Sequence, residues 1–390
     1  MGNEIDKPAN KGKVGVITLP GDFNYGGKLQ LRAVMSIYRG LGYDPEFLVL
    51  ERKFRLIAHP KEIARRALHK PSPRSMSLEE AQPPARRAAF RRFSEGMRPH
   101  IYQSPSEVDA SSFVFFSVGS DQVWNPNYIF TENDGGNGVK RAYHLLTDPR
   151  ELPDERDWYF LGFARRDQRV ALAPSFGVSS LDRHQARLTS KGLSGFDCLS
   201  VREEAGARLI ENLTGQHAEV ICDPTLALSR GDWEMVSDDR VTPNGPYVLA
   251  YVLGQRTDES NEAIRIASKE GSLPVVRLSD QARPGEPDAG PAEFISLVEH
   301  ASCVVTDSFH ASVFAAIFER PLVIVRRQGK GQSGMFSRLE SLIHMLGIES
   351  MVFDGTYDAP AHADYDGVAE AIARERKRFV GYLESVLESR

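Results

Sequence analysis

The sequence predicts an α/β fold of two domains, each with strands and helices in alternation. Short apolar runs rich in Val, Ile and Leu alternate with longer runs of helical spacing along most of the chain. Complete strand–helix–strand patterns stand near each end, in residues 13–50 and 303–325. The length of 390 residues is also sufficient for two domains with their own cores.

The first domain is expected to span residues 12–235. It begins with an apolar strand at 13–18, a glycine-bearing turn at 21–27 and a helix at 29–41, which Gly42 ends. A basic, mostly helical segment at 52–98 and a glycine-rich, flexible insertion at 130–157 interrupt the alternation. Further strands are expected at 46–50, 113–118, 169–173, 198–202 and 220–222, with a helix from Glu203.

The second domain is expected to span residues 240–365. Its clearest unit is a buried strand at 303–306, an apolar helix at 311–318 and a strand at 322–325, with Pro321 ending the helix. Residues 326–338 are basic and glycine-rich, which favours a loop. A long charged helix at 366–390 is expected to close the chain. The other expected elements are strands at 247–253 and 274–278 and helices at 260–269 and 292–300.

The composition is that of an ordinary globular protein, with 41% hydrophobic and 26% charged residues. No apolar run reaches the roughly 18 residues that a spanning helix needs. The N-terminus lacks the apolar core of a signal peptide, so we expect a cytoplasmic protein. Cys198, Cys222 and Cys303 lie far apart, which indicates a reducing compartment and neither a disulfide framework nor a metal site.

Positive charge is concentrated in one part of the chain. Residues 51–100 hold 13 Lys and Arg against 5 Asp and Glu, although the whole protein carries a net charge of −5. One interpretation is a solvated helical face. The other is peripheral contact with an anionic membrane at its inner face, or with a lipid-linked phosphate. No nucleic acid is expected, because the aromatic residues of a base-stacking platform are missing.

A histidine occupies the first crossover turn of the 303–325 unit. His310 and Ser308 stand between the strand and the helix, and ligands of open parallel sheets collect at this end of the strands. His310 could be a core residue that caps a strand end. It could instead transfer protons, because its unperturbed pKa is about 6.5.

Other polar residues follow strands of the first domain and could face the same site. Arg202 follows the strand at 198–202 and could hold an anion with its guanidinium fork, or simply pair with Glu203 or Glu204 on the surface. Asp223 and Thr225 are expected to organise an interdomain hinge. The remaining candidates could bind substrate or merely shape their turns: Asn24, Gly26, Ser120, Asp121, Gln122 and Ser175.

Seven stretches in order resemble the polysaccharide pyruvyl transferase family. They are NYGGKLQLRAV, VGSDQVWNP, APSFG, LSVREEAGARLI, CDPTLAL, DSFHASVFAAIFERPLVIV and SRLESLIHMLGI. The resemblance implies two Rossmann-like domains facing each other across a cleft, as in GT-B glycosyltransferases. It also implies transfer of the enolpyruvyl part of phosphoenolpyruvate to two sugar hydroxyls, giving a cyclic pyruvate ketal and phosphate.

The resemblance carries over some site residues and leaves one role open. His310 would be catalytic and Arg202 would bind the donor. One branch of the family has Arg two residues before the histidine, where this chain has Ser308, and the following residue is commonly Gly rather than Ala311. A second anion-binding cation must therefore come from elsewhere, and the candidates are Arg326, Lys330 and Arg338.

The implied partners are phosphoenolpyruvate as donor and a lipid-linked or oligosaccharide sugar as acceptor, with no cofactor and no metal. Two other functions remain open. A GT-B glycosyltransferase would bind a nucleotide sugar in the second domain. A non-catalytic scaffold would keep the fold without turnover.

Overall fold

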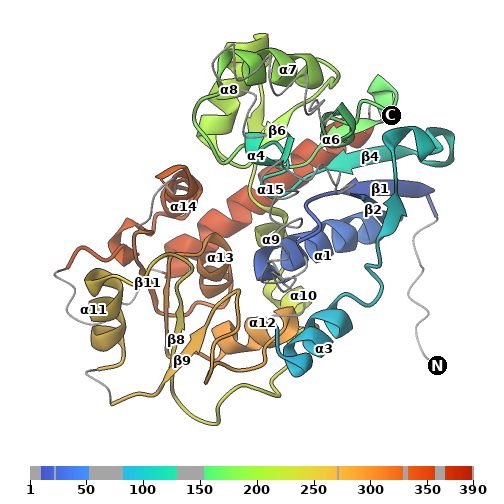
Figure 1. The fold of residues 1–390 in the computed structure, drawn as a ribbon. Coiled ribbons are helices and arrows are strands. Elements are labelled where there is room, and N and C mark those ends of the chain that lie inside the picture. The colour runs from blue at the N-terminus through green and yellow to red at the C-terminus, as the bar shows by residue number, and fades with distance from the viewer. Residues whose placement is uncertain are drawn as a thin grey trace, which may run out of the picture.

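Two parallel β-sheets, one from each half of the chain, form the frame of the molecule (Figure 1). The computed structural model describes residues 10–21, 23–51, 82–129, 153–269, 272–327, 333–355 and 365–388. Lys330, most of the insertion at 130–157 and the larger part of the basic segment at 52–98 lie outside these residues.

The first sheet is five-stranded and entirely parallel. Its strands are β1 (Lys13–Ile17), β2 (Asp44–Leu50), β3 (His100–Tyr102), β4 (Phe115–Val118) and β5 (Arg169–Ala171), in the order β3-β2-β1-β4-β5. Val14 of β1 pairs with Pro45 on one side and Phe115 on the other. Val14 and Val16 are fully buried, as expected for a central strand covered on both faces.

The second sheet has four parallel strands in the order β11-β10-β8-β9. They are β8 (Val248–Tyr251), β9 (Val275–Leu278), β10 (Cys303–Thr306) and β11 (Leu322–Ile324). A third, two-stranded sheet pairs β6 (Ser200–Val201) with β7 (Glu219–Val220) and extends the first half. Parallel sheets joined by helices confirm the predicted α/β class and its two Rossmann-like halves.

Helices lie on both faces of the sheets. Those of the first half are α1 (Tyr25–Gly40), α3 (Pro84–Phe93), α4 (Pro126–Ile129), α6 (Pro153–Tyr159), α7 (Arg183–Leu193), α8 (Glu204–Thr214), α9 (Pro224–Ala227) and α10 (Arg230–Glu234). Those of the second half are α11 (Asp258–Ala267), α12 (Pro291–Glu299), α13 (Phe309–Ile317), α14 (Ser333–Leu346) and α15 (Tyr365–Glu388). Short 3-10 turns are η1 (Pro105–Glu107), η2 (Ala110–Ser112), η3 (Arg166–Gln168) and η4 (Glu349–Met351).

Local sequence explains where several helices begin and end. Asn24 caps α1 by accepting a hydrogen bond from the Gly27 N–H at 2.7 Å, and Asp182 caps α7 in the same way. Gly215 ends α8 with a φ of 71°, a backbone conformation that glycine adopts without steric cost.

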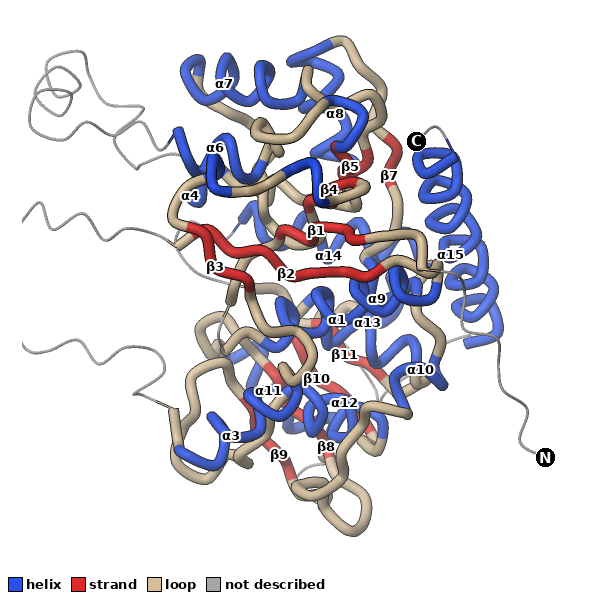
Figure 2. The backbone as a smooth tube through the Cα atoms, turned by 90° about the vertical axis from the view of Figure 1, so that its right-hand side faces the viewer, coloured by secondary structure: helices blue, strands red, loops and turns tan. Residues whose placement is uncertain are grey.

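A single apolar layer lies between the two sheets and belongs to both halves. Figure 2 shows α1 and α13 between the sheet that contains β1 and the sheet that contains β10. Tyr25 of α1 stacks on Phe294 of α12 with ring centroids 5.0 Å apart and meets Tyr251 of β8 edge-on at 5.8 Å. Its hydroxyl donates to the Ala289 carbonyl at 2.8 Å. The two halves are therefore joined by a continuous hydrophobic core.

The long C-terminal helix also connects the halves. In Figure 1, α15 runs from the side of α14 to the side of β4. The Tyr382 hydroxyl donates to the Ala171 carbonyl at the end of β5 at 2.8 Å, and Phe379 and Tyr382 are buried. The chain thus returns to its first half after it has completed the second sheet.

One side of the described part of the basic segment, residues 82–98, packs against the second half, while Arg91 and Arg98 are exposed. Arg86 is completely buried, donates to the Ser279 carbonyl and lies 5.2 Å from the centre of the Tyr25 ring. Arg92 pairs with Glu293, a carboxylate 1% exposed, at 2.7 Å. Arg86 is therefore not part of a solvated helical face, whereas the Arg92 side chain remains 42% exposed beside its partner. Their role between the halves could not be read from charge alone.

Three expectations about local structure are wrong. Helix α1 begins at Tyr25, so Gly26 and Gly27 lie in its first turn and not in a loop. Residues 333–338 belong to α14 and not to a loop, because apolar residues at helical spacing outweigh the glycine content. The end of the predicted flexible insertion, residues 153–157, is the start of α6, whose Trp158 is buried.

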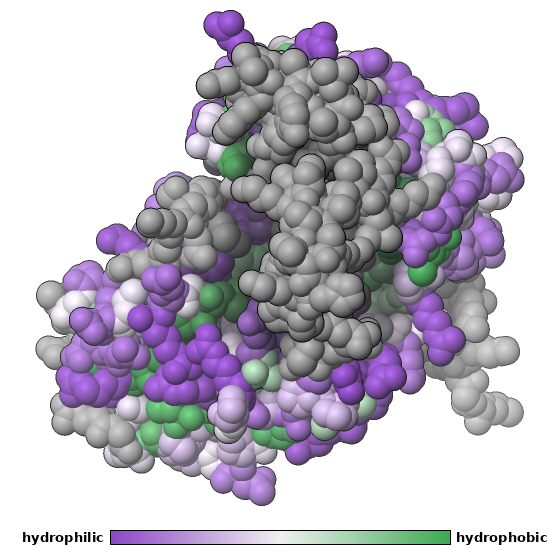
Figure 3. All heavy atoms as spheres, viewed as in Figure 1, coloured by the Kyte–Doolittle hydropathy of each residue, from purple (hydrophilic) through white to green (hydrophobic). Residues whose placement is uncertain are grey.

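Among the described helices, none combines the length and the apolar character that crossing a bilayer requires. Hydrophilic side chains cover most of the described surface on the face that Figure 3 shows, with apolar patches scattered between them.

Candidate active site

His310 lies where the two halves of the chain meet. It occupies the first turn of α13, directly after β10, and Ser308 caps this helix by accepting from the Ala311 N–H at 3.4 Å. The imidazole packs against the first turn of α1. A methyl group at Gly26 would lie 2.1 Å from Nδ1 of His310, which no real contact permits. Glycine is therefore required at position 26 for the histidine to lie against α1.

Arg202 forms a buried ion pair at the end of β6. Its Nη1 donates to Oδ2 of Asp223 at 2.6 Å, and both side chains are at most 1% exposed. The guanidinium lies 4.7 Å from the centre of the Phe309 ring, so a residue of the second half covers an arginine of the first. Nε and Nη2 are buried and make no hydrogen bond in the described structure. Two donors of this arginine are thus available to a ligand.

Asp223 is held in place by several donors. Its Oδ1 accepts from the N–H and the hydroxyl of Thr225, at 2.9 and 2.6 Å. Its Oδ2 accepts from the Ser120 hydroxyl at 2.9 Å as well as from Arg202, and lies 4.0 Å from Nε2 of His310. The Ser120 N–H donates in turn to Gln30 of α1 at 3.0 Å. These bonds fix one carboxylate beside both the arginine and the histidine.

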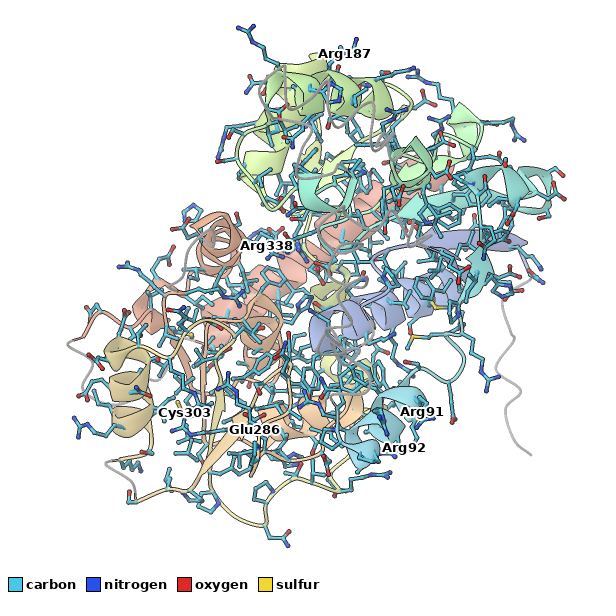
Figure 4. The ribbon with its side chains drawn as sticks, in the orientation of Figure 1. Arg91, Arg92, Arg187, Glu286, Cys303 and Arg338 are labelled. Carbon is cyan, nitrogen blue, oxygen red and sulfur yellow. The ribbon has the colours of Figure 1, made fainter. Side chains whose placement is uncertain are left out.

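Arg338 brings a second guanidinium to the same place from α14. Figure 4 shows it between the ribbons of the two halves. Its Nη1 lies 3.9 Å from Oδ1 of Asp121, and the same oxygen lies 3.8 Å from Nη2 of Arg202. The end of the Gln122 amide lies 3.0 Å from Nη2 of Arg338. Nε of Arg338 is buried without a partner among the described residues, so this side chain too has a free donor.

Glu203 orders the loop on the far side of Arg202. Its Oε1 accepts from the Ser175 hydroxyl at 2.8 Å and from the Phe176 N–H at 2.9 Å. The Ser175 N–H donates to the Asp121 carbonyl at 2.8 Å, which ties this loop to the one that carries Asp121 and Gln122. The Ser175 hydroxyl is therefore engaged with Glu203.

Burial and neighbouring charges shift the pKa values of the site. Burial lowers the pKa of His310 below its usual 6.5, and the opposing effect of Asp223 does not compensate. Burial would raise the pKa of Asp223, but Arg202 and His310 hold it at about 2. Burial and the charge of Arg202 lower the pKa of Arg338 to about 10. Near neutral pH the histidine is neutral and both arginines are charged.

The predicted site residues fall into groups. His310, Arg202, Arg338, Asp121 and Gln122 meet at the interface of the two halves. Asn24 and Ser308 serve as helix N-caps, Gly26 supports the histidine, and Ser120 and Ser175 hold the acidic residues behind the arginines. Arg338 was one of three candidates for the second cation. Lys330 lies outside the described residues.

Asp223 is the residue that the sequence interpretation missed. It was assigned to a hinge, yet it contacts Arg202 and faces His310. Its position directly after β7, next to the strand that precedes Arg202, was the available signal. Asp307, three residues before His310, is not among the charged groups that act on the imidazole in the described structure. The Asp307 carboxylate instead accepts from the Leu253 N–H at 2.7 Å and pairs with Arg327 at 3.1 Å.

The site can bind an anion and move a proton. A small pocket between the halves is lined by Arg202, Asp223, Leu226, Phe309, Val313, Leu342 and Met345. Buried guanidinium donors without partners favour a carboxylate or a phosphate. An imidazole beside them can take up a proton when neutral and deliver one when protonated. Within the described ranges, no three His, Cys, Asp or Glu side chains are grouped to hold a metal ion.

Solved structures of similar fold include an epimerase and a glycosyltransferase. UDP-GlcNAc 2-epimerase from Neisseria meningitidis, bound to UDP-GlcNAc, is 10% identical, with a TM-score of 0.41 and coverage of 96% of this chain and 99% of that chain. The glycosyltransferase SnogD from Streptomyces nogalater is 14% identical, with a TM-score of 0.39 and coverage of 97% and 98%. Similarity at this level carries no information about substrates.

The family comparison is more specific. No match was found among curated proteins. The family model described as polysaccharide pyruvyl transferase matches residues 24–329, which include Arg202, Asp223 and His310 but not Arg338. The match covers most of the chain, and the chain belongs to the polysaccharide pyruvyl transferase family.

Proposed function

We propose that this protein is a ketal pyruvyltransferase. It would transfer the pyruvyl group of phosphoenolpyruvate to two hydroxyls of a sugar, in exopolysaccharide or cell-surface glycan biosynthesis, with no cofactor. The observation that carries the proposal is the convergence of two arginines with unpartnered buried donors, Arg202 and Arg338, on the imidazole of His310. Phosphoenolpyruvate offers this site a carboxylate and a phosphate.

The reaction can be written with these residues in defined roles. His310, protonated once the donor anion lies beside it, would deliver a proton to the methylene carbon of the donor, and a sugar hydroxyl would add to C2 and pass its proton to the imidazole. The C2–O bond to phosphate would then break, and a second hydroxyl would add to C2, give its proton to the departing phosphate and close the ketal. Arg202 and Arg338 would hold the carboxylate and the departing phosphate. The neutral imidazole could also receive the proton of an attacking hydroxyl.

A binding and a turnover assay test the proposal. Phosphoenolpyruvate should raise the melting temperature, because a ligand that binds only the folded state stabilises it, and UDP- and GDP-sugars should not. With sugar acceptors present, inorganic phosphate should appear together with an acid-labile ketal. Stabilisation by a nucleotide sugar but not by phosphoenolpyruvate would favour a glycosyltransferase. Stabilisation by neither ligand and no turnover would favour a scaffold.

We predict that Arg202→Lys weakens phosphoenolpyruvate binding by at least ~1.4 kcal/mol, about tenfold. Lysine keeps the charge beside Asp223 but loses the planar fork and the Nε donor, which has no partner among the described residues. Calorimetry measures the affinity, and thermal melting shows whether the variant is folded. The matched control is Arg187→Lys on the exposed surface of α7, which should bind the donor like wild type (Figure 4). Unchanged donor affinity in Arg202→Lys would remove this arginine from the site.

The acceptor is proposed to be lipid-linked and the protein to touch the inner face of an anionic membrane. A groove supports this. The groove is lined by Pro20 and Phe23, which precede α1, and by residues of β2, β3 and α3. The first turn of α1 also packs against His310. The walls of the groove are mostly apolar, and they carry the basic residues Lys28, Arg87, Arg91 and Arg98 against the acidic residues Glu51 and Glu95. An apolar chain with a phosphate would match this lining.

We predict salt-sensitive binding to vesicles that contain anionic lipid, and weaker binding to neutral ones. Arg91→Glu reverses one charge at the groove and should reduce co-sedimentation severalfold. Arg187→Glu makes the same change on α7 and should leave co-sedimentation unaltered. Equal binding to neutral and anionic vesicles at low salt would contradict a membrane role for this surface.

A further inference from the structure

In the free protein, the candidate site already contains carboxylates that would repel a donor with several negative charges. Within the described residues, the carboxylates of Asp121, Asp223 and Glu203 lie around the guanidinium groups of Arg202 and Arg338. Phosphoenolpyruvate would bring a carboxylate and a phosphate into this group. Like charges close together in a buried site repel strongly. At least one of the three carboxylates must therefore move away from the guanidinium groups when the donor binds.

Asp223 and Glu203 are poor candidates to move. Asp223 accepts hydrogen bonds from Thr225, Ser120 and Arg202, and its side chain is fully buried. Glu203 accepts from the hydroxyl of Ser175 and from the backbone, and is 1% exposed. Displacing either would break several buried hydrogen bonds.

Asp121 differs from both. Its carboxylate is 3.8 Å from Arg202 and 3.9 Å from Arg338, which is attractive but too long for a hydrogen bond. Its side chain is 16% exposed, so it can turn towards solvent. The atom of Arg202 at 3.8 Å is Nη2, which has no hydrogen-bond partner among the described residues. Asp121 thus stands between the two arginines without being bound tightly by either.

The backbone holds Asp121 in this position. Its φ is 63°, in the left-handed region that few residues other than glycine adopt, and its carbonyl accepts from the Ser175 N–H at 2.8 Å. Aspartate and asparagine tolerate this conformation better than most side chains. Residues kept in such conformations often serve the function of a site.

We propose that Asp121 is an internal substitute for the donor anion. In the free protein its carboxylate occupies the place between Arg202 and Arg338 and offsets the repulsion of two buried guanidinium groups. The carboxylate or phosphate of the donor displaces it, and it returns when phosphate leaves. This inference rests on the proposed function, and it assigns Asp121 to the exchange of anions instead of to substrate binding or the shaping of a turn.

The test compares anion affinity in wild type and Asp121→Asn. Asparagine keeps the size and the backbone conformation but removes the competing charge. Calorimetry with phosphoenolpyruvate, and separately with inorganic phosphate, should show at least ~fivefold tighter binding to the variant. A merely structural role would give weaker binding instead. In turnover assays KM for phosphoenolpyruvate should fall. The value of kcat should not increase, because no carboxylate at position 121 competes with the product phosphate for the two arginines and so promotes its release.

Asp239→Asn is the matched control. It changes the net charge equally at an exposed position of the loop that precedes β8, and it should bind both anions like wild type. Unchanged or weaker binding of both anions to a folded Asp121→Asn protein would overturn the inference. The same holds if neither anion binds to wild type or to Asp121→Asn. If phosphate binds more tightly to the variant but phosphoenolpyruvate binds to neither protein, the anion exchange stands and the proposed reaction fails.

Discussion

His310→Gln is expected to lower turnover by a factor on the order of 10²–10⁴ while changing donor affinity much less. Glutamine can fill the space beside Gly26 and hydrogen-bond, but it cannot deliver or accept a proton near neutral pH. Nε2 of His310 lies 4.0 Å from Oδ2 of Asp223 and is buried without a hydrogen-bond partner among the described residues. A substrate atom can therefore hydrogen-bond to Nε2. Coupled assays for phosphate release and ketal formation would measure the loss.

The pH profile separates proton transfer from a structural role of His310. Burial lowers the pKa of His310 in the free protein, so its ionisation should appear in kcat/KM below pH 6.5. This ionisation should be missing in His310→Gln and present in the surface variant His217→Gln. A bound anion next to the ring would raise its pKa and favour the protonated form. Near-wild-type turnover in both His310→Gln and His310→Ala would show that the proton donor lies elsewhere.

Asp223→Ala is expected to destabilise the protein by about 3–5 kcal/mol, because it leaves the buried charge of Arg202 without its closest partner. Removing the carboxylate also leaves the hydroxyls of Ser120 and Thr225 without an acceptor. Denaturant unfolding would measure the change, with the exposed Asp239→Ala variant as a control that should stay within about 0.5 kcal/mol of wild type. Stability equal to wild type would contradict the ion pair.

Asp223→Asn provides a milder variant in case the alanine protein does not fold. Asparagine can keep the hydrogen bond from the Thr225 N–H but loses the charge. The folded pKa of Asp223, about 2, lies below the value of 3.8 for a free aspartate. Between these values the unfolded chain binds more protons, so the contribution to stability is present above pH 4 and is lost as the pH falls towards 2. This part of the acid dependence should vanish in Asp223→Asn.

The fold could be predicted in large part because strands and helices here depend on local apolar patterns. Strand β10 matches its predicted range, and β1, β8, β9 and β11 lie within or near theirs. Helix α14 was not predicted, and the glycines of 326–338 suggested a loop where it begins. Helix α7 and strand β3 were also missed, since their patterns are short and interrupted by polar residues.

The site was less predictable, because pairing between distant residues leaves no local pattern. His310 and Arg202 follow strands of different sheets, and only the structure shows that they share Asp223. Arg338 reaches the site from a helix that the sequence did not predict at that position. The buried Arg86 shows the same limit, since its partners are carbonyl oxygens more than 190 residues away in the chain.

The two halves form separate sheets, but they share one apolar layer. Neither half is therefore expected to fold without the other. If the chain were divided between residues 235 and 240, each fragment would expose one side of the layer around Tyr25 and Phe294. Exposed surfaces of that kind favour aggregation. The two sheets should therefore form one cooperative unit, with similar protection from hydrogen exchange in β1 and β10. Binding at the site would then require local side-chain movements, and not the opening of one half against the other.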